Sequence, residues 1–399
     1  MKSYLFLISL FAVLCVPNGY AQEPPVVHYQ SDAEIPKLSK SIQKMIDKKA
    51  IAGAIVMVSW KGKIIHYHAE GMRDIKEKSS LQKDSVVRIY SMTKPVTSVA
   101  VMMLHERGLL QLDDPIEKYL PEFQDVGVHH KRRVLPLKRS ITIRDLMRHT
   151  AGFSYGFFSN TAVDKMYMKN HPLYSRNNRE MTKKLSAYPL LSQPGKKWHY
   201  SVATDVLGDL VERVSGMSLG EFFAQNITKP LSMNDTSFSV SSDRIDRFSS
   251  VYGPKQKPKE YYKKSHYLQS NRIQSGGGGL VSTAQDYMRF CEMLVHGGEL
   301  DGVRLLTQKS VAEMTKNQLP EGVFTYGVFG FGLGFQVQLY DWGNKGHIGE
   351  YGWDGAASTH FWISPSDELI VVALSQRQPY SSQLKEKIKP IIYRHIKNR

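Results

Sequence analysis

The strand-forming segments of this chain lie near its two ends, and this separation limits the folds that are open to it. Residues 54–60 (AIVMVSW) and 63–71 (KIIHYHAEG) predict one hairpin, and residues 358–364 (STHFWIS) and 368–375 (ELIVVALS) predict a second. Between them, from about 91 to 274, helical patterns and polar loops predominate. We therefore expect an antiparallel sheet that both ends of the chain build together, with a largely helical region inserted.

Helical patterns also flank the strands. Residues 35–49 repeat apolar side chains at helical spacing, and a last helix is expected from about 382 to 396. The expected fold class is α+β, with a sheet lobe (about 22–90 and 275–399) and a helical lobe (about 91–274). No repeat or low-complexity linker divides the chain into independent domains.

The first residues predict export. Residues 1–21 combine a basic Lys2, an apolar stretch over 4–16 that is too short to span a bilayer, and a small Ala21 where a signal peptidase would cut. The expected location is therefore periplasmic or secreted. Residues 22–399 should then form the single catalytic unit.

Charge and cysteine content restrict the partners. The formal net charge is +16, with basic runs at 129–133 and 254–265. We interpret these runs as solvated loops and leave open a contact with an anionic envelope surface. We expect no nucleic acid partner, because no nucleic-acid-binding module accompanies the charge.

Cys291 would be the only cysteine after cleavage, so no internal disulfide is expected. The 14 histidines show no metal-ligand spacing, and we expect neither metal nor cofactor.

Ser91 and Lys94 form the first candidate pair. Ser91 precedes an apolar helical stripe that ends at Gly108, and Lys94, three residues on, can share its face. A serine before a helix is commonly an N-cap, and Lys94 would then lie on the surface. The alternative is a nucleophile beside a base.

Tyr200 stands in the loop before a second apolar stripe, which ends at Gly216. A tyrosine there usually packs, but a phenol near Ser91 and Lys94 could take or relay the hydroxyl proton. Unperturbed lysine and tyrosine titrate near 10, so one of them must be shifted to act as a base at neutral pH.

Together these motifs resemble the serine β-lactamase and penicillin-binding-protein superfamily. The residues that carry the likeness are S-x-x-K at 91–94, Y-S-x at 200–202, and the triad at 353–355 before F-W-I-x-P; RDLMRHTAG (144–152) also agrees. The likeness spans about 35–395 and is greatest to the class C-like branch, in particular the family VIII carboxylesterases.

The resemblance implies roles for these residues. Ser91 would be the acylated nucleophile, while Lys94 and Tyr200 would act on its proton, and which of the two is the base stays open. The backbone N–H groups of Ser91 and Ala356 would form the oxyanion hole. Trp353 and Gly355 would contact the substrate.

Two departures from the β-lactamase pattern point to the substrate. Val202 replaces an asparagine whose amide grips β-lactams, and Trp353 stands where a lysine would hold the substrate carboxylate. Asp354 would add a negative charge near the pocket. Neutral acyl esters should therefore be favoured over anionic penicillins.

Two other motifs compete for these assignments. His347-Ile348-Gly349, six residues before Trp353, is an alternative triad, because it resembles the His-x-Gly of some members of the superfamily. Residues 152–156 match the G-x-S-x-G of α/β-hydrolases, but no buried strand precedes Ser154, so we expect this serine to be structural.

The predicted activity is carboxylic ester hydrolysis through an acyl-Ser91 intermediate, with a small ester or amide as substrate. One alternative keeps the machinery and makes the protein a β-lactamase or a peptidoglycan D-amino acid peptidase. Another is a catalytically silent protein that binds envelope glycans.

Overall fold

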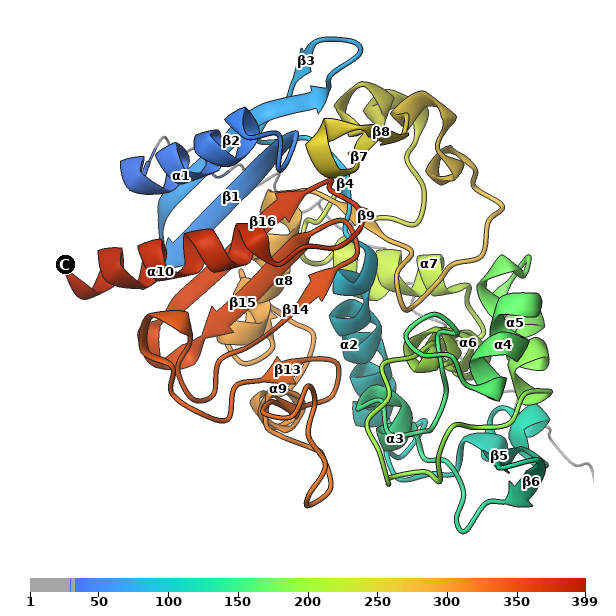
Figure 1. Ribbon diagram of the computed structural model, residues 1–399. Coiled ribbons are helices and arrows are strands. Elements are labelled where there is room, and N and C mark those ends of the chain that lie inside the picture. Colours follow the sequence, from blue (N-terminus) through green and yellow to red (C-terminus); the bar gives the residue numbers. More distant parts are fainter. Residues whose placement is uncertain (1–28, 30–32) are drawn as a thin grey trace, which may run out of the picture.

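The computed structural model describes residue 29 and residues 33–399. The predicted signal at 1–21 lies outside the described residues. The main feature is an antiparallel eight-stranded sheet with the order β12-β13-β14-β15-β16-β1-β2-β3 (Figure 1). Its strands are β1 (Gly53–Trp60), β2 (Lys63–Asp74), β3 (Ser79–Ser80), β12 (Gly330–Phe331), β13 (Gln336–Val337), β14 (Tyr351–Gly355), β15 (Thr359–Ser364) and β16 (Leu369–Ser375).

The two predicted hairpins meet at the centre of this sheet. β1 pairs with β16 over seven positions, from Ala54 opposite Ser375 to Trp60 opposite Leu369. The first strands and the last strands of the chain therefore become neighbours, which confirms the α+β fold with an antiparallel sheet built by both ends.

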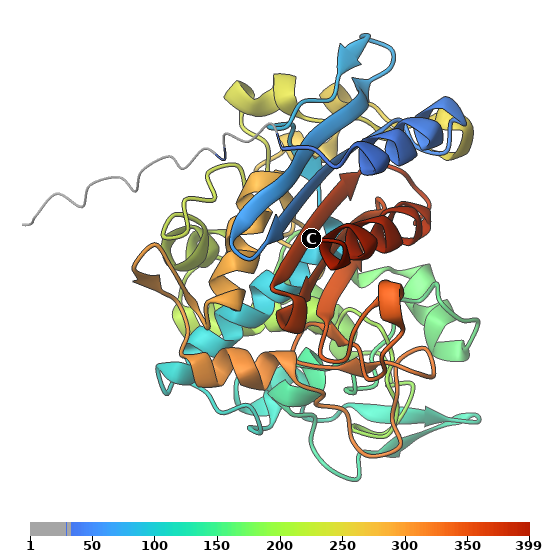
Figure 2. The ribbon, with the colours of Figure 1, turned by 90° about the vertical axis from the view of Figure 1, so that its left-hand side faces the viewer.

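Helices from both ends cover one face of the sheet. α1 (Pro36–Asp47) and α10 (Gln383–Lys397) lie side by side on it in both views (Figures 1 and 2). Their apolar residues enclose Val56, Val371 and Trp362 in a separate core. α8 (Ala284–Val295), which contains the buried Cys291, packs on the opposite face against β1 and β16.

The remaining helices gather mostly beside that second face. They are α2 (Thr93–Glu106), α3 (Ile143–Met147), α4 (Ala162–Lys169), α5 (Asn178–Ser186), α6 (Ala203–Ser215), α7 (Leu219–Phe223) and α9 (Gln308–Thr315). Short two-stranded pairings join the loops: β4 (Val87–Arg88) with β9 (Val281–Ser282), β5 (Gly127–His130) with β6 (Arg133–Pro136), β7 (Val251–Tyr252) with β8 (Pro258–Glu260), and β10 (Glu299–Leu300) with β11 (Val303–Arg304).

α2 is buried all round, although its sequence predicted a single apolar face. Every side chain from Thr93 to Leu104 is inaccessible or nearly so. Its polar side is satisfied internally: the Thr97 hydroxyl donates to the Gly276 carbonyl (2.7 Å), and the Thr93 hydroxyl accepts from the Leu280 amide (3.1 Å). The helix that follows Ser91 is therefore held rigidly between the two lobes.

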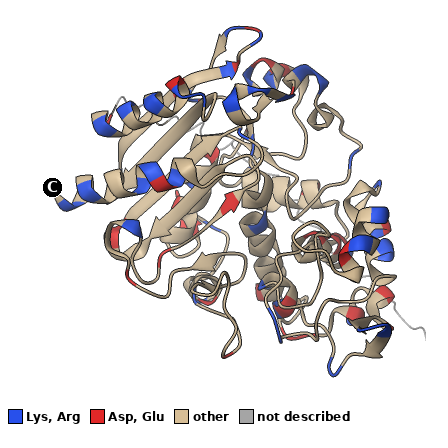
Figure 3. Cartoon of the chain, in the orientation of Figure 1, with Lys and Arg blue, Asp and Glu red and all other residues tan. Residues whose placement is uncertain are grey.

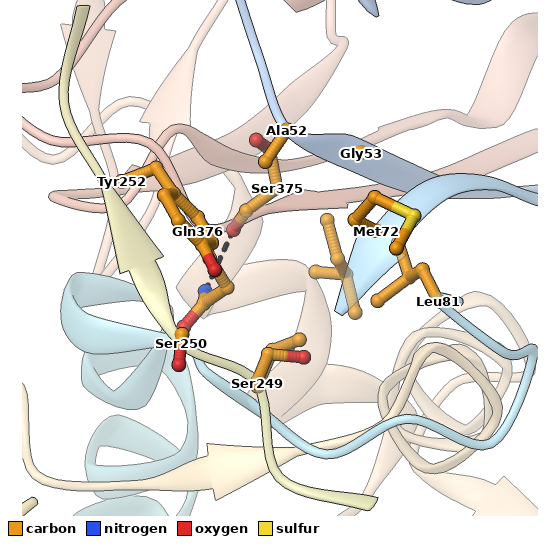
Figure 4. A pocket seen from close by; sticks show the side chains of 11 residues that line it. Ala52, Gly53, Met72, Leu81, Ser249, Ser250, Tyr252, Ser375 and Gln376 are labelled. Atoms are coloured by element: carbon orange, nitrogen blue, oxygen red, sulfur yellow. Dashed lines mark hydrogen bonds between the residues drawn. The ribbon is translucent and has the colours of Figure 1, made fainter. Parts of the chain in front are cut away.

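The structure also contains a small pocket of about 10 Å³. It lies between β1, β2, β7 and β16, and its lining includes Ala52, Leu81 and Tyr252 (Figure 4). None of the candidate catalytic residues borders it, so it is not the site of chemistry.

No helix in the described part of the chain is long and apolar enough to cross a bilayer.

Candidate active site

Ser91 lies in a tight turn between β4 and α2, in the short 3-10 helix Tyr90–Met92. Tyr90 has a φ of 44°, a left-handed conformation that is uncommon for a tyrosine. Functional residues are often held next to such strained positions. Ser91 itself is only partly buried, so its hydroxyl is accessible at the head of a buried helix.

Lys94 is fully buried one turn later, and three groups surround its amine. The Nζ atom is 3.2 Å from the Ser91 Oγ, 2.8 Å from the Tyr155 hydroxyl and 2.5 Å from the Gly277 carbonyl oxygen. The alternative in which Ser91 caps a helix beside a surface lysine is thereby excluded, because this lysine is not on the surface and Ser91 makes no capping bond.

The surroundings of Lys94 favour the neutral amine. Burial lowers its pKa to about 7, and the nearby Asp205 carboxylate opposes that shift. Asp205 is itself buried and accepts hydrogen bonds from the Ser275 hydroxyl and the Gly277 amide. A Cβ on Gly277 would lie 2.3 Å from the Asp205 carboxylate, so glycine lets the backbone approach this side chain closely.

Tyr200 approaches the same pair from the loop before α6. The Lys94 Nζ lies 4.6 Å from the centre of its ring, and the Trp353 indole N–H donates to its hydroxyl at 3.2 Å. Burial raises the pKa of Tyr200 well above 10, although hydrogen bonds to Ser91 and Trp353 act in the opposite direction. Tyr200 is therefore a neutral phenol at physiological pH.

Trp353 and Gly355 belong to β14, which pairs with the predicted strand that follows them. A Cβ on Gly355 would lie 2.3 Å from the Ile89 carbonyl, so glycine lets the end of β14 touch the segment that leads to Ser91. Ala356 follows in the turn to β15. Among the described residues, neither its amide nor that of Ser91 has a backbone acceptor.

The negative charge of Asp354 was expected to disfavour anionic substrates. Neighbouring side chains neutralise this charge, which corrects that prediction. Successive side chains of a strand face opposite sides, so Asp354 points away from the face of Trp353. Its carboxylate lies 3.2 Å from the Lys385 Nζ, 2.9 Å from the His360 Nδ1 and 2.6 Å from the Tyr380 hydroxyl. Burial opposes the charge, but Lys385 and His360 hold the pKa of Asp354 well below its usual range.

The competing motifs lie elsewhere. His347 is 2.6 Å from Asp367, and Ile348 is exposed, so the structure brings Trp353 and not the alternative triad to Tyr200. Ser154 is buried, donates to Asp164 and accepts from a backbone amide, which is a structural role.

Sequence reasoning missed two members of the site. Tyr155 lies in the segment that was set aside with Ser154, yet its hydroxyl contacts Lys94. Asp205 begins the D-V-L-G run after Tyr200, but the sequence assigned it no role. The glycine run at 276–279 was the one available signal, because four adjacent glycines indicate close backbone packing. In the described part of the chain, no cluster of histidine, cysteine or acidic residues could hold a metal ion.

The fold and this site define a serine hydrolase-type enzyme with the β-lactamase and transpeptidase architecture. A family model described as Beta-lactamase matches residues 38–390, and the chain belongs to this family. The resemblance inferred from the motifs is thereby confirmed, including the likeness to the esterase branch.

Several relatives cover nearly the whole chain. Protein Rv1367c of Mycobacterium tuberculosis is 33% identical over 359 residues, which cover 85% of this chain and 89% of the relative. Esterase EstB of Burkholderia gladioli is 26% identical and covers 85% and 89%. Among solved structures, EstCE1, a hydrolase with promiscuous acyltransferase activity, is 25% identical, superposes with a TM-score of 0.79 and covers 90% and 98%.

Proposed function

We propose that the protein hydrolyses carboxylic esters through an acyl-Ser91 intermediate, with Lys94 as the base. The observation that carries the proposal is the position of Lys94, fully buried, 3.2 Å from the Ser91 Oγ and with a pKa of about 7. A base is most effective when its pKa lies near the working pH. Tyr200, whose pKa is raised, is unsuited to remove the proton.

The hydrogen bonds around Lys94 fit a neutral amine. Such an amine has two N–H donors and one lone pair. The carbonyl of Gly277 accepts one donor and the hydroxyl of Tyr155 accepts the other. The lone pair is then directed at the Ser91 hydroxyl, from which it takes the proton.

The proposed reaction runs in two halves. The Ser91 Oγ attacks the ester carbonyl while its proton passes to the Lys94 Nζ, and the amides of Ser91 and Ala356 bind the resulting oxyanion. As the C–O bond breaks, the Tyr200 hydroxyl protonates the departing alkoxide and recovers a proton from Lys94. Water then attacks the acyl group in the same way, which releases the carboxylic acid and restores Ser91.

Local composition supports a neutral substrate. Trp353 and Phe158 lie against Tyr200, with ring centres 5.2 and 5.7 Å away, so apolar rings border the reacting atoms. The Val202 side chain is completely buried in the core and offers no polar group to a β-lactam. The curated relatives named as esterase and acyltransferases are consistent with ester chemistry.

Paired turnover of p-nitrophenyl butyrate and nitrocefin tests this proposal. We expect rapid ester cleavage and slow or absent nitrocefin cleavage, because neither Val202 nor Trp353 can bind a β-lactam as an asparagine and a lysine would. Nitrocefin turnover comparable to ester turnover would favour the β-lactamase or peptidase alternative.

The pH profile of kcat/KM should identify the base. Lys94 must be neutral to accept a proton, so the rate should rise with pH through about 7 and then level off. Asp205 raises the pKa of Lys94, and Asp205→Asn should therefore move the inflection to lower pH. An inflection that stays in place in this variant, or a rate that rises only where tyrosine ionises, would assign the base to another group.

A further inference from the structure

A contiguous apolar surface lies next to the catalytic residues. Phe157, Phe158, Met168 and Tyr174 are 58%, 63%, 58% and 86% exposed. Ring centres of Phe157 and Phe158 are 4.7 Å apart, and His171 connects Phe157 (6.5 Å) to Tyr174 (5.3 Å). Scattered exposed apolar side chains are normal, but a continuous group is not. The aromatic patch, as we define it, comprises Phe157, Phe158, Met168 and Tyr174. The Met168 side chain lies beside Gly156, the residue that precedes Phe157.

The patch begins at the active site and extends onto α4. The rings of Phe157 and Tyr155 stack with centres 5.4 Å apart, and Phe158 lies 5.7 Å from Tyr200. On α4, Val163 and Tyr167 face the core, whereas Met168 is exposed. Burial in the fold therefore does not account for this methionine.

Basic side chains surround the patch. Residues 157–184 contain six lysines and arginines but only Asp164 and Glu180 as acids, a net charge of +4. Asp164 is occupied by hydrogen bonds from three hydroxyls, and Glu180 pairs with Arg176 and Lys184. Figure 3 shows Lys and Arg concentrated over α4 and α5.

Three of these lysines are free to interact with a partner. Lys165, Lys169 and Lys183 are exposed and form no ion pair within the described residues. Lys165 and Lys169 are one turn apart on the same face of α4, and Lys169 directly follows Met168. An apolar patch with aromatic and sulfur side chains inside a border of lysines matches the interface of a bilayer, with acyl chains below and anionic headgroups at its edge.

We propose that the aromatic patch docks the protein on an anionic lipid bilayer, so that the site around Ser91 faces the membrane surface. Phe157, Phe158 and Met168 would enter the region between headgroups and acyl chains, while Lys165 and Lys169 would contact lipid phosphates. Because the patch adjoins Tyr200, esters held in or near the membrane would reach Ser91 directly. Docking itself does not depend on the chemistry proposed for Ser91.

Vesicle co-sedimentation of the full chain tests the proposal. We expect binding to vesicles that contain phosphatidylglycerol, weaker binding to pure phosphatidylcholine, and a loss of binding at high salt. The double variant Met168→Ser/Tyr174→Ser should bind about tenfold more weakly, as expected when part of the buried apolar area is removed. Residues 1–21 are common to all variants and contribute equally to each.

A matched control uses apolar residues outside the patch. Leu109 and Tyr340 are 50% and 51% exposed, so Leu109→Ser/Tyr340→Ser removes one aliphatic and one aromatic side chain outside the patch and should bind like the unmodified protein. Thermal unfolding of both double variants would show that they fold. The proposal is overturned if the protein ignores anionic vesicles or if both double variants bind alike. It is also overturned if the patch variant abolishes self-association instead, since the patch would then cover a second copy.

Discussion

Replacing Ser91 by alanine should lower kcat for p-nitrophenyl butyrate by about 10⁴- to 10⁶-fold, the range expected when a catalytic nucleophile is removed. The change deletes only the Oγ atom, which lies 3.2 Å from the Lys94 amine, so the fold should be unaffected. The measurement is steady-state ester turnover, with circular dichroism as the check on folding.

Ser154→Ala is the matched control for this experiment. Ser154 has the sequence context of an α/β-hydrolase nucleophile, but its hydroxyl is buried and bonded to Asp164. This variant should keep most of its activity and lose some stability, because the Asp164 carboxylate loses a hydrogen bond. A Ser91→Ala protein that remained fully active would eliminate Ser91 as the nucleophile.

Lys94→Arg should reduce kcat/KM almost as strongly as Lys94→Ala, by about 10²- to 10⁴-fold, the usual contribution of a general base. Arginine keeps the positive charge but cannot give up its proton at accessible pH. If Lys94 acts by accepting the Ser91 proton, retaining the charge does not help. If it acts only by its electric field, Lys94→Arg should retain much more activity than Lys94→Ala.

Folding must be checked for both Lys94 variants, because this side chain is completely buried. Lys94→Met provides a third comparison of similar length without charge. If the methionine and alanine variants unfold at the same temperature and have equally low activity, the loss of activity is caused by the missing amine and not by altered packing.

The architecture could be predicted because local signals were strong. Apolar β-branched runs with tight turns marked both hairpins, and their placement at the two ends of the chain required them to meet. The same reasoning was incomplete for α2, where the pattern predicted one apolar stripe and the structure buries Thr93 and Thr97 as well. Those hydroxyls are instead bonded to Leu280 and Gly276, which are almost two hundred positions away in the sequence.

The active site could likewise be predicted only in part. Ser91, Lys94 and Tyr200 each belong to a motif with recognisable spacing, and the structure brings all three together. Tyr155 and Asp205 act through contacts that only the tertiary structure creates, and no local sequence spacing indicates these contacts. Asp354 shows the converse, because its charge was visible in the sequence but Lys385, which neutralises it, was not assignable.

The most direct test of the central claim is to trap the acyl-enzyme. The protein would be mixed with p-nitrophenyl butyrate, quenched in acid during turnover, digested and analysed by mass spectrometry. We predict a butyryl group on the peptide that contains Ser91, at the Ser91 side chain, and none in the Ser91→Ala variant. The account would be contradicted if the protein hydrolysed the ester at the same rate while Ser91 stayed unmodified and the butyryl group was found on another residue.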